Sequence, residues 1–291
     1  MSADNFLTLS QHRIQDWLSR FLEQQNSLSA PLTAAMRHAV LNGGKRVRPA
    51  LAYAAAQACG GLPEQADAAA GAVELVHCYS LVHDDLPCMD DDDLRRGVPT
   101  CHKVYGEATA LLAGDTLQTL AFVALTDGRL SGAQLARQVQ RLAHASADMA
   151  VGQALDLAAE GKALSLAELE AVHRHKTGAL IRAAVFLGAV AAGCEDEQTL
   201  AALETYADRL GLAFQVHDDV LDVIGDTSTL GKKAGADAEH EKATYPALLG
   251  LDAARDLASR LHDEAVAALA PLGARAEALR WLADFLVDRD H

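Results

Sequence analysis

Apolar residues recur at helical spacing along nearly all of this 291-residue chain, and this pattern leaves little room for a sheet. Runs of β-branched residues are scarce, and glycine and proline are few, with 21 and 7 residues, which also favours helices. We therefore predict an all-α chain. The predicted helices cover about 5–25, 30–42, 47–59, 64–86, 104–127, 131–159, 165–193, 196–225, 245–270 and 273–289.

The breaks between these helices are short, and no linker rich in proline or serine divides the chain. We therefore predict one domain over residues 1–291. Two polar segments stand apart from the helices. Residues 87–103 form an acidic and then basic loop, and residues 226–244 have the composition of a mobile lid.

The overall charge excludes several kinds of partner. A formal net charge of −15 argues against binding to nucleic acid or attraction to an anionic membrane surface. The most apolar stretch, 179–193, is interrupted by Arg182 and is too short to span a bilayer, and the N-terminus lacks the apolar run of a signal peptide. The five cysteines form no CxxC pair. We expect a cytoplasmic protein with reduced thiols and no stable membrane insertion.

Two aspartate clusters carry the main chemical signal. The sequence Val-His-Asp-Asp occurs at 82–85 and again at 216–219, each time directly after an apolar stretch, where a carboxylate is costly unless it is paired or bound to metal. In the second cluster, Asp218 and Asp222 are four residues apart, on one helical face, where they repel each other. Carboxylate oxygens favour Mg²⁺, which also takes phosphate oxygens as ligands. The clusters therefore predict a magnesium site.

The first cluster needs a break in its helix. Asp84 and Asp90 are six residues apart and would lie on different faces of a continuous helix, so Pro87 must interrupt the helix if they are to converge. Helical geometry alone does not distinguish Asp90 from Asp91 as the second ligand.

Basic residues accompany the acidic clusters. The segment 43–49, Gly-Gly-Lys-Arg-Val-Arg-Pro, concentrates cations and helix-start amides that can hold a phosphate without metal. Arg95 and Arg96 follow the first cluster, Lys176 lies within a predicted helix, and Lys232 lies in the predicted lid. In so acidic a chain, cations beside carboxylate clusters indicate a polyanionic substrate together with a metal.

These motifs together resemble one family. Gly43–Pro49, Asp84-Asp85-Leu86-Pro87-Cys88-Met89-Asp90, Asp91–Gly97, Gly152–Leu157, His175–Gly178, Phe214–Asp222 and Leu230–Lys232 span about residues 43–250. In this order they resemble the all-trans short-chain polyprenyl diphosphate synthases, and among them the bacterial farnesyl type.

The resemblance implies a fold, an assembly and a set of ligands. It implies an isoprenoid-synthase-type helical bundle around a deep central cavity, with the two acidic helices facing each other across its mouth, and a homodimer. It implies three Mg²⁺ ions per active site, held by Asp84, Asp90 and Asp218. The implied ligands of the allylic diphosphate are Arg95, Lys176, Gln215 and Lys232, with Thr177 nearby; those of isopentenyl diphosphate are Lys45, Arg48, His77 and Arg96, with Gly44 adjacent.

The implied reaction is ionisation, condensation and elimination, with Asp84, Asp90, Arg95, Lys176, Asp218 and Lys232 as the catalytic set. Isopentenyl diphosphate would be condensed with dimethylallyl or geranyl diphosphate to give farnesyl diphosphate. Several side chains keep two interpretations. Phe214 fits either a place beside the allylic cation or the core, Gln153 and Asp156 fit either the cavity or a structural pair, and His83 and His217 fit either a second layer around the site or the surface.

Product length is predicted from the helix that precedes the first cluster. Ser80 lies about 40° from the face of Asp84, whereas Tyr79 lies about 140° away, so helical geometry alone would not choose Tyr79 as the cavity floor. In the resembled family, an aromatic residue at the fifth position before the motif, with the two-residue lengthening seen in 86–89, accompanies a C15 product. A C10 or C20 product of the same chemistry is the alternative.

Three other classes fit less well. A terpene cyclase would carry a different second metal motif and would not need Lys45 and Arg48. A metal-dependent phosphohydrolase built on His83-Asp84 or His217-Asp218 would need further histidine ligands. A non-catalytic subunit of a heteromeric synthase would be expected to lose an acidic motif, and both are intact here.

Overall fold

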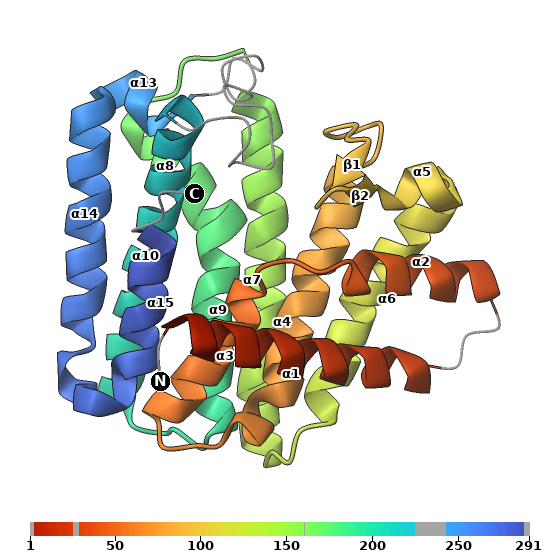
Figure 1. Ribbon diagram of the computed structural model, residues 1–291, viewed down its shortest axis with the longest axis horizontal. Coiled ribbons are helices and arrows are strands. Elements are labelled where there is room, and N and C mark those ends of the chain that lie inside the picture. The colour runs from red at the N-terminus through yellow and green to blue at the C-terminus, as the bar shows by residue number, and fades with distance from the viewer. Residues whose placement is uncertain (1–2, 26–28, 160, 225–242, 288–291) are drawn as a thin grey trace.

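The computed structural model describes residues 3–25, 29–159, 161–224 and 243–287, and these residues are almost entirely helical (Figure 1). The all-α prediction is therefore confirmed. The helices are α1 (Ala3–Gln24), α2 (Ala30–Leu41), α3 (Val47–Ala58), α4 (Pro63–Asp84), α5 (Cys101–Tyr105), α6 (Glu107–Thr126), α7 (Gly132–Ala159), α8 (Leu166–His173), η1 (Arg174–Gly178), α9 (Ala179–Ala191), α10 (Glu197–Ile224), α13 (Tyr245–Leu249), α14 (Leu251–Ala268), η2 (Ala270–Ala276) and α15 (Glu277–Val287).

The predicted boundaries differ from the structure at a few backbone breaks. The helix predicted over 104–127 is divided into α5 and α6 at Gly106, and the helix predicted over 245–270 is divided into α13 and α14 at Gly250. Both glycines have positive φ angles, +82° and +86°, which end a right-handed helix. The loop after α4 contains an unpredicted two-residue hairpin, β1 (Leu94–Arg95) paired antiparallel with β2 (Val98–Pro99). Most of the predicted lid over 226–244, namely residues 226–242, lies outside the described residues.

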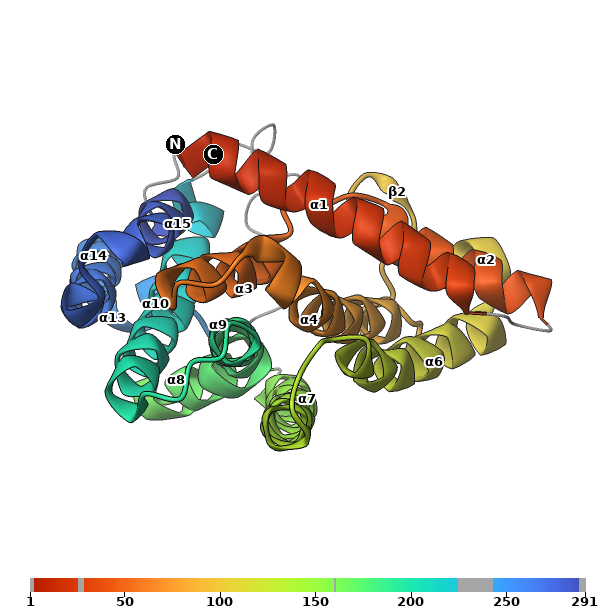
Figure 2. The same ribbon diagram turned by 90° about the horizontal axis from the view of Figure 1, so that it is seen from below.

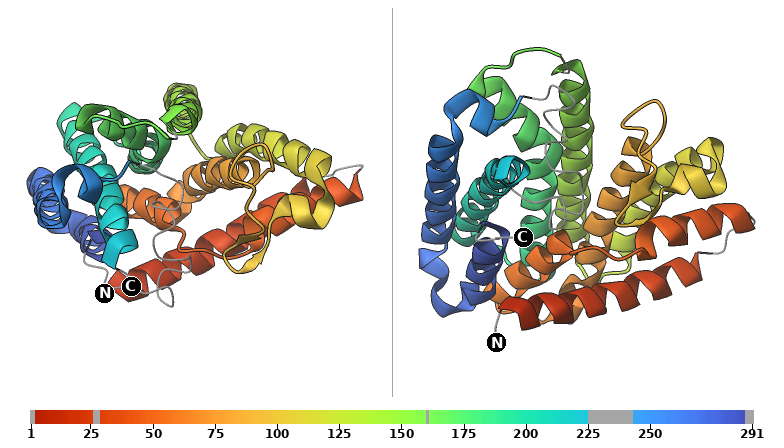
Figure 3. Two further views of the ribbon diagram at one scale, coloured as in Figure 1. Left: turned by 90° about the horizontal axis from the view of Figure 1, so that it is seen from above. Right: turned by 45° about the horizontal axis from the view of Figure 1, so that its top comes forward.

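The most apolar helix lies at the centre of the bundle. α9 is buried along nearly its whole length and packs against α3, α4, α7 and α10, as the view from below shows (Figure 2). The prediction that 179–193 is a buried helix is confirmed. α1 and α2 cross one face, and α14 and α15 pack outside α10. The carboxyl ends of α4 and α10, which carry the two acidic clusters, lie at the same end of the bundle (Figure 3).

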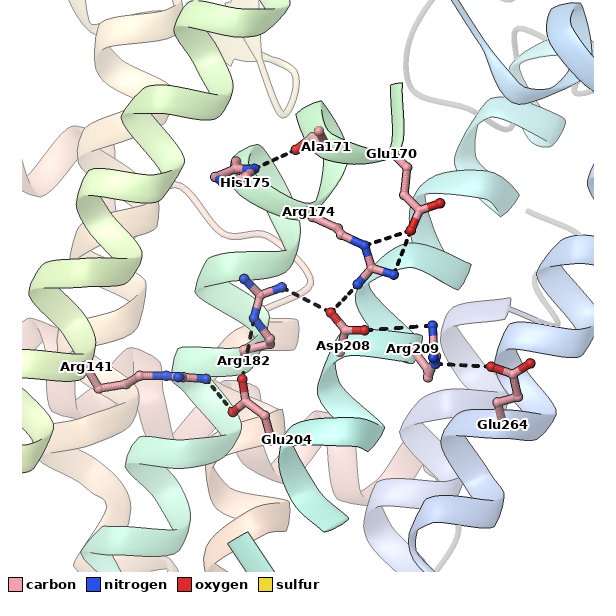
Figure 4. A network of polar contacts seen from close by, with 10 residues as sticks. All are labelled: Arg141, Glu170, Ala171, Arg174, His175, Arg182, Glu204, Asp208, Arg209 and Glu264. Atoms are coloured by element: carbon pink, nitrogen blue, oxygen red, sulfur yellow. Dashed lines mark hydrogen bonds and ion pairs between the residues drawn. The ribbon is translucent and has the colours of Figure 1, made fainter. Parts of the chain in front are cut away.

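A network of ion pairs fastens the short π-helix η1 to its neighbours (Figure 4). The Arg174 guanidinium binds Glu170 of α8, with Nε 2.8 Å from the carboxylate, and also pairs with Asp208 of α10. Arg182 of α9, the charge that interrupts the apolar stretch, lies 3.4 Å from Asp208 and 3.6 Å from Glu204. π-Helical turns are rare and concentrate at functional sites. The network holds in place the segment that carries Lys176 and Thr177.

Candidate active site

The loop between α2 and α3 lines a first cavity of about 490 Å³. All five residues that the family resemblance implied for isopentenyl diphosphate line it: Gly44, Lys45, Arg48, His77 and Arg96. Phe214, for which the sequence left two interpretations, also lines this cavity and is half-buried. The cavity therefore combines a cationic rim with apolar wall residues.

Arg46 is a structural cation that the sequence analysis did not separate from its neighbours. It is buried at the start of α3 with a φ of +50°, and its guanidinium pairs with the buried Glu74 of α4 and donates to the carbonyl of Val40 and to Gln15. A buried cation in this position needs such a partner. The glutamate within the apolar run of α4 was the available signal, because a buried carboxylate implies a buried cation.

Within the part of the chain that the structure describes, Arg48 and His77 have no carboxylate partner like the one that Glu74 provides for Arg46. The Nε of Arg48 is buried and has no hydrogen-bond partner among the described residues, and burial lowers the pKa of Arg48, outweighing the opposite effect of Glu74. Burial and the surrounding arginines, first Arg48 and Arg96, hold the pKa of His77 well below its usual range, so the imidazole is neutral. A bound anion would stabilise Arg48 and supply the missing partner.

A second cavity of about 390 Å³ adjoins the first. Arg48 and His77 line both cavities, so the two spaces meet at these side chains. Asp84, Lys176 and Thr177 line the second cavity, and so do Tyr79 and Ser80. Tyr79 therefore does line the cavity, although its helical angle from Asp84 did not favour it, because the space extends around α4 toward α7.

The first acidic cluster converges through its loop. α4 ends at Asp84, before Pro87, and the backbone N–H of Asp90 donates to the carbonyl of Asp84 at 2.8 Å. The predicted interruption of the helix is confirmed. Burial is the main cause that raises the pKa of the Asp84 carboxyl to about 6, and Asp90 raises it further against the opposing effects of Lys176 and Arg95.

The other acids of this cluster hold basic side chains. Arg95 donates through Nε to Asp85 at 2.8 Å and lies 2.7 Å from Asp92, so the structure places this predicted substrate ligand in a pair with two carboxylates. Asp93 lies 2.7 Å from Lys103. Asp85, Asp92 and Asp93 therefore form ion pairs within this loop and with the start of α5.

The predicted ligands on η1 and α10 lie together. Thr177 Oγ1 donates to Gln215 Oε1 at 2.9 Å, and Lys176 Nζ is 2.5 Å from Asp156, which answers the open question on Asp156. Gln153 lines the cavity, and neither of its amide atoms has a partner among the described residues. α7 approaches η1 closely at Gly152, where a Cβ atom would lie only 2.2 Å from the backbone nitrogen of Lys176.

The carboxylates of the second acidic cluster differ in exposure. Asp218 is exposed and Asp222 half-buried, one turn apart on α10, whereas Asp219 is buried and accepts a hydrogen bond from the Tyr245 N–H at 2.9 Å. Lys232 lies outside the described residues.

The two histidines beside the acidic pairs lie in different places. His83 lines the second cavity, and its Nε2 is 3.0 Å from the Leu111 carbonyl of α6. His217 lines a separate small cavity between α10 and α14.

The carboxylates fit a hard metal ion. Asp84 and Asp90 offer only oxygen donors, which a hard cation such as Mg²⁺ prefers, and burial raises the pKa of Asp84, so a bound cation would favour its charged form. Across the described parts of the chain, no three His, Cys, Asp or Glu side chains gather tightly enough to enclose an ion by themselves.

We expect Asp84→Asn to stabilise the metal-free protein at pH 7.5. The folded pKa of about 6 exceeds the ordinary value of 3.8, so the folded state binds the proton more tightly and loses stability as the pH rises between these values. The shift corresponds to about 2–3 kcal/mol above pH 6, which asparagine would recover. Thermal melting in EDTA at several pH values measures it, and the advantage of the variant should shrink toward pH 4.

Asp93→Asn is the matched control for this prediction. Asp93 belongs to the same acidic run, but Lys103 lowers its pKa, so removing its charge should not stabilise the protein. An Asp84→Asn variant that melts at or below the wild-type temperature at pH 7.5 would refute this view of the site.

Two adjoining cavities, one with Lys45, Arg48 and Arg96 in its lining and the other with Asp84 and Lys176, define a helical enzyme site in which charged groups adjoin apolar walls. The chain belongs to the polyprenyl synthetase family, whose model matches residues 29–269.

Named relatives agree with this membership. The chain is 52% identical over 281 residues to farnesyl diphosphate synthase of Escherichia coli (strain K12), covering 94% of each chain. It is 46% identical over 263 residues to a chloroplastic geranylgeranyl pyrophosphate synthase of Catharanthus roseus, covering 88% of this chain and 73% of that relative. Geranyltransferase from Helicobacter pylori, solved in complex with magnesium and isoprenyl diphosphate, superposes with a TM-score of 0.82 at 35% identity and covers 97% and 96% of the two chains.

Proposed function

We propose that this protein is a magnesium-dependent prenyltransferase that condenses isopentenyl diphosphate with dimethylallyl or geranyl diphosphate to give farnesyl diphosphate. The observation that carries the proposal is the pair of adjoining cavities that share Arg48 and His77. One offers cations for a diphosphate that needs no metal, and the other offers the Asp84 carboxylate, with the rest of the acidic cluster following it in the chain, for a metal-bound diphosphate. The similarity to the farnesyl diphosphate synthase of E. coli supports it.

The first cavity is the isopentenyl diphosphate site. Lys45, Arg48 and Arg96 neutralise the diphosphate, and the buried Nε of Arg48 gains the acceptor that it lacks. Neutral His77 donates a hydrogen bond without adding charge. The apolar wall beside Phe214 and Ile181 holds the five-carbon chain close to the second cavity.

The second cavity is the allylic site. Asp84, Asp90 and Asp218 would hold three Mg²⁺ ions, which when bound stabilise the negative charge that develops on the departing diphosphate. Lys176 faces the same diphosphate, with Thr177 and Gln215 beside it, and we assign Arg95 and Lys232 to the same role. Preorganised cations of this kind act where charge develops in the transition state.

The reaction joins the two substrates with balanced bonds. The C1–O bond of the allylic substrate breaks, and its electron pair leaves with the diphosphate. The double bond of isopentenyl diphosphate then forms the new C–C bond with the allylic cation, and the released diphosphate accepts the proton lost from C2. The protein's part is to hold both chains in a largely apolar space and to exclude water from the cation.

Incubating the protein with labelled isopentenyl diphosphate, dimethylallyl diphosphate and Mg²⁺ tests the proposal. Chromatography of the dephosphorylated products should give mainly farnesol, with none formed in EDTA. Formation of cyclic hydrocarbons from farnesyl diphosphate would instead identify a terpene cyclase, and the absence of any prenyl product would refute the proposal.

Charge removal in the two cavities should affect different substrates. Arg48→Ala should raise the KM for isopentenyl diphosphate about ten- to hundredfold, because one charge-assisted hydrogen bond is worth roughly 1.5–3 kcal/mol. Lys176→Ala should act by a similar factor on the allylic substrate. Separate KM measurements for each substrate check this, and a shift of the same substrate by both variants would contradict the assignment of two sites.

We further propose a cytoplasmic homodimer of a single catalytic domain over residues 1–291. Large apolar side chains are exposed on the outer faces of α6 and α7, among them Leu111, Leu112, Val151 and Leu155. Within the described residues, α6 is the helix long and apolar enough to cross a membrane by length and composition alone. We assign this surface to pairing with a second copy, and the oligomeric state in solution tests the assignment. The five free thiols support a reducing compartment.

A further inference from the structure

Tyr79 is held from outside the cavity that it lines. Its ring is buried in the wall of the second cavity, and at 1.5 Å per residue it lies about 7 Å along α4 from Asp84. Its hydroxyl lies 3.1 Å from Ser146 Oγ of α7. The orientation of the ring is therefore fixed by a buried polar contact as well as by packing.

The contact continues to α6. Gln118 Nε2 donates to the same Ser146 Oγ at 3.2 Å, so the hydroxyls of Ser146 and Tyr79 and the amide of Gln118 form a chain. Ser146 is buried, and neither Ser146 nor Gln118 lines the cavity. Burial raises the pKa of Tyr79, so its hydroxyl remains a neutral hydrogen-bonding group.

The other side of the ring is supported by a histidine that is itself fixed. The His83 ring packs edge-on against Tyr79 with centroids 5.8 Å apart, and His83 Nε2 lies 3.0 Å from the Leu111 carbonyl of α6. His83 fits because Gly114 of α6 leaves room, since a Cβ atom there would lie 2.1 Å from His83 Nε2. Side chains of α6 and α7 thus hold the Tyr79 hydroxyl, and His83 of α4, itself bound to the backbone of α6, supports the edge of the ring.

We propose that Ser146 and Gln118 are positioning residues that hold the Tyr79 ring across the path of the growing prenyl chain and so determine product length. The inference rests on the prenyltransferase function proposed above and adds a layer of specificity outside the cavity. A wall residue limits chain length only if it resists displacement by the chain. A buried hydroxyl that would lose its partner on moving resists displacement strongly.

The test is the product distribution of Ser146→Ala and Gln118→Ala with isopentenyl and geranyl diphosphates. We expect the ratio of C20 to C15 product to rise about five- to tenfold in Ser146→Ala and less in Gln118→Ala, since losing one partner of a buried hydrogen bond corresponds to about such a factor. The KM for geranyl diphosphate should stay within about twofold of wild type. Ser146→Thr keeps the hydroxyl and should restore the C15 product.

A double-mutant cycle separates positioning from a general loosening of the bundle. In a Tyr79→Phe background no hydroxyl needs Ser146, so adding Ser146→Ala should leave the product ratio unchanged. Thr119→Ala is the matched control on α6, because Thr119 is exposed and bonds only to its own helix at Asp115.

Two results would overturn the inference while leaving the prenyltransferase intact: C15 alone from both Ser146→Ala and Gln118→Ala, or an equal effect of Ser146→Ala with and without the Tyr79 hydroxyl. A wild-type protein that forms no prenyl product would instead overturn the proposed function, and this inference with it.

Discussion

Asp84→Asn, Asp90→Asn and Asp218→Asn should each lower turnover by at least about a thousandfold at saturating Mg²⁺. Each substitution removes a negative oxygen ligand from a site whose cations offset the charge of the leaving diphosphate, and a thousandfold corresponds to about 4 kcal/mol of transition-state stabilisation. Asparagine keeps the shape and the helix end, so the fold should persist. Steady-state turnover, with circular dichroism to verify folding, measures the effect.

The contrast with Asp93→Asn makes this prediction specific. Asp93 is exposed and paired with Lys103, so its loss should leave turnover within about twofold of wild type. The same Asp84→Asn protein that is inactive should melt at a higher temperature than wild type in EDTA. Function requires a buried charge at Asp84 that lowers the stability of the metal-free protein. Near-wild-type turnover in any of the three variants would remove that residue from the proposed metal site.

Ser80→Phe should convert the product almost completely from C15 to C10. Ser80 lines the second cavity one turn before Asp84, and a phenyl ring there would occupy space that the third isoprene unit needs. Tyr79→Ala should act in the opposite direction, because it removes the ring from the cavity wall and admits products of C20 or longer. Chromatography of the dephosphorylated products from both variants checks the two directions together.

The first condensation provides the internal control for these variants. Because Asp84, Lys176 and Arg48 are unchanged, both variants should still convert dimethylallyl diphosphate to a C10 product. A Ser80→Phe protein that still makes only C15, or a wild-type protein that makes mainly C20, would contradict this account of chain length without affecting the prenyl-transfer assignment.

The helical fold was largely predictable because its signal is local. Apolar periodicity located most helices to within a few residues, and the apolar run 179–193 is the central helix α9. The divisions at Gly106 and Gly250 were missed because a glycine at positive φ ends a helix only when the fold requires the turn. Periodicity also continues through η1, so the π-helical turn could not be distinguished from an ordinary helix.

The sequence predicted which residues could form the site but not the partners that they have in the structure. A motif suggested Lys45 and Arg48, and the family resemblance alone implied His77; the structure places all three around one cavity. The contacts of Arg46 with Glu74 and of Arg95 with Asp85 join residues on different elements, which no spacing rule encodes. That Tyr79 lines the cavity could not be predicted either, because it follows from the extension of the cavity toward α7, which is a different element.

The central claim is that the chain holds two diphosphates at once, one with metal and one without. Calorimetric titration with isopentenyl diphosphate and with a thiolo analogue of geranyl diphosphate, which ionises poorly, tests it directly. We predict that the analogue binds only with Mg²⁺, and that isopentenyl diphosphate still binds, one per chain, to protein saturated with the analogue. Competition between the two ligands, or tight binding of the analogue in EDTA, would contradict the account.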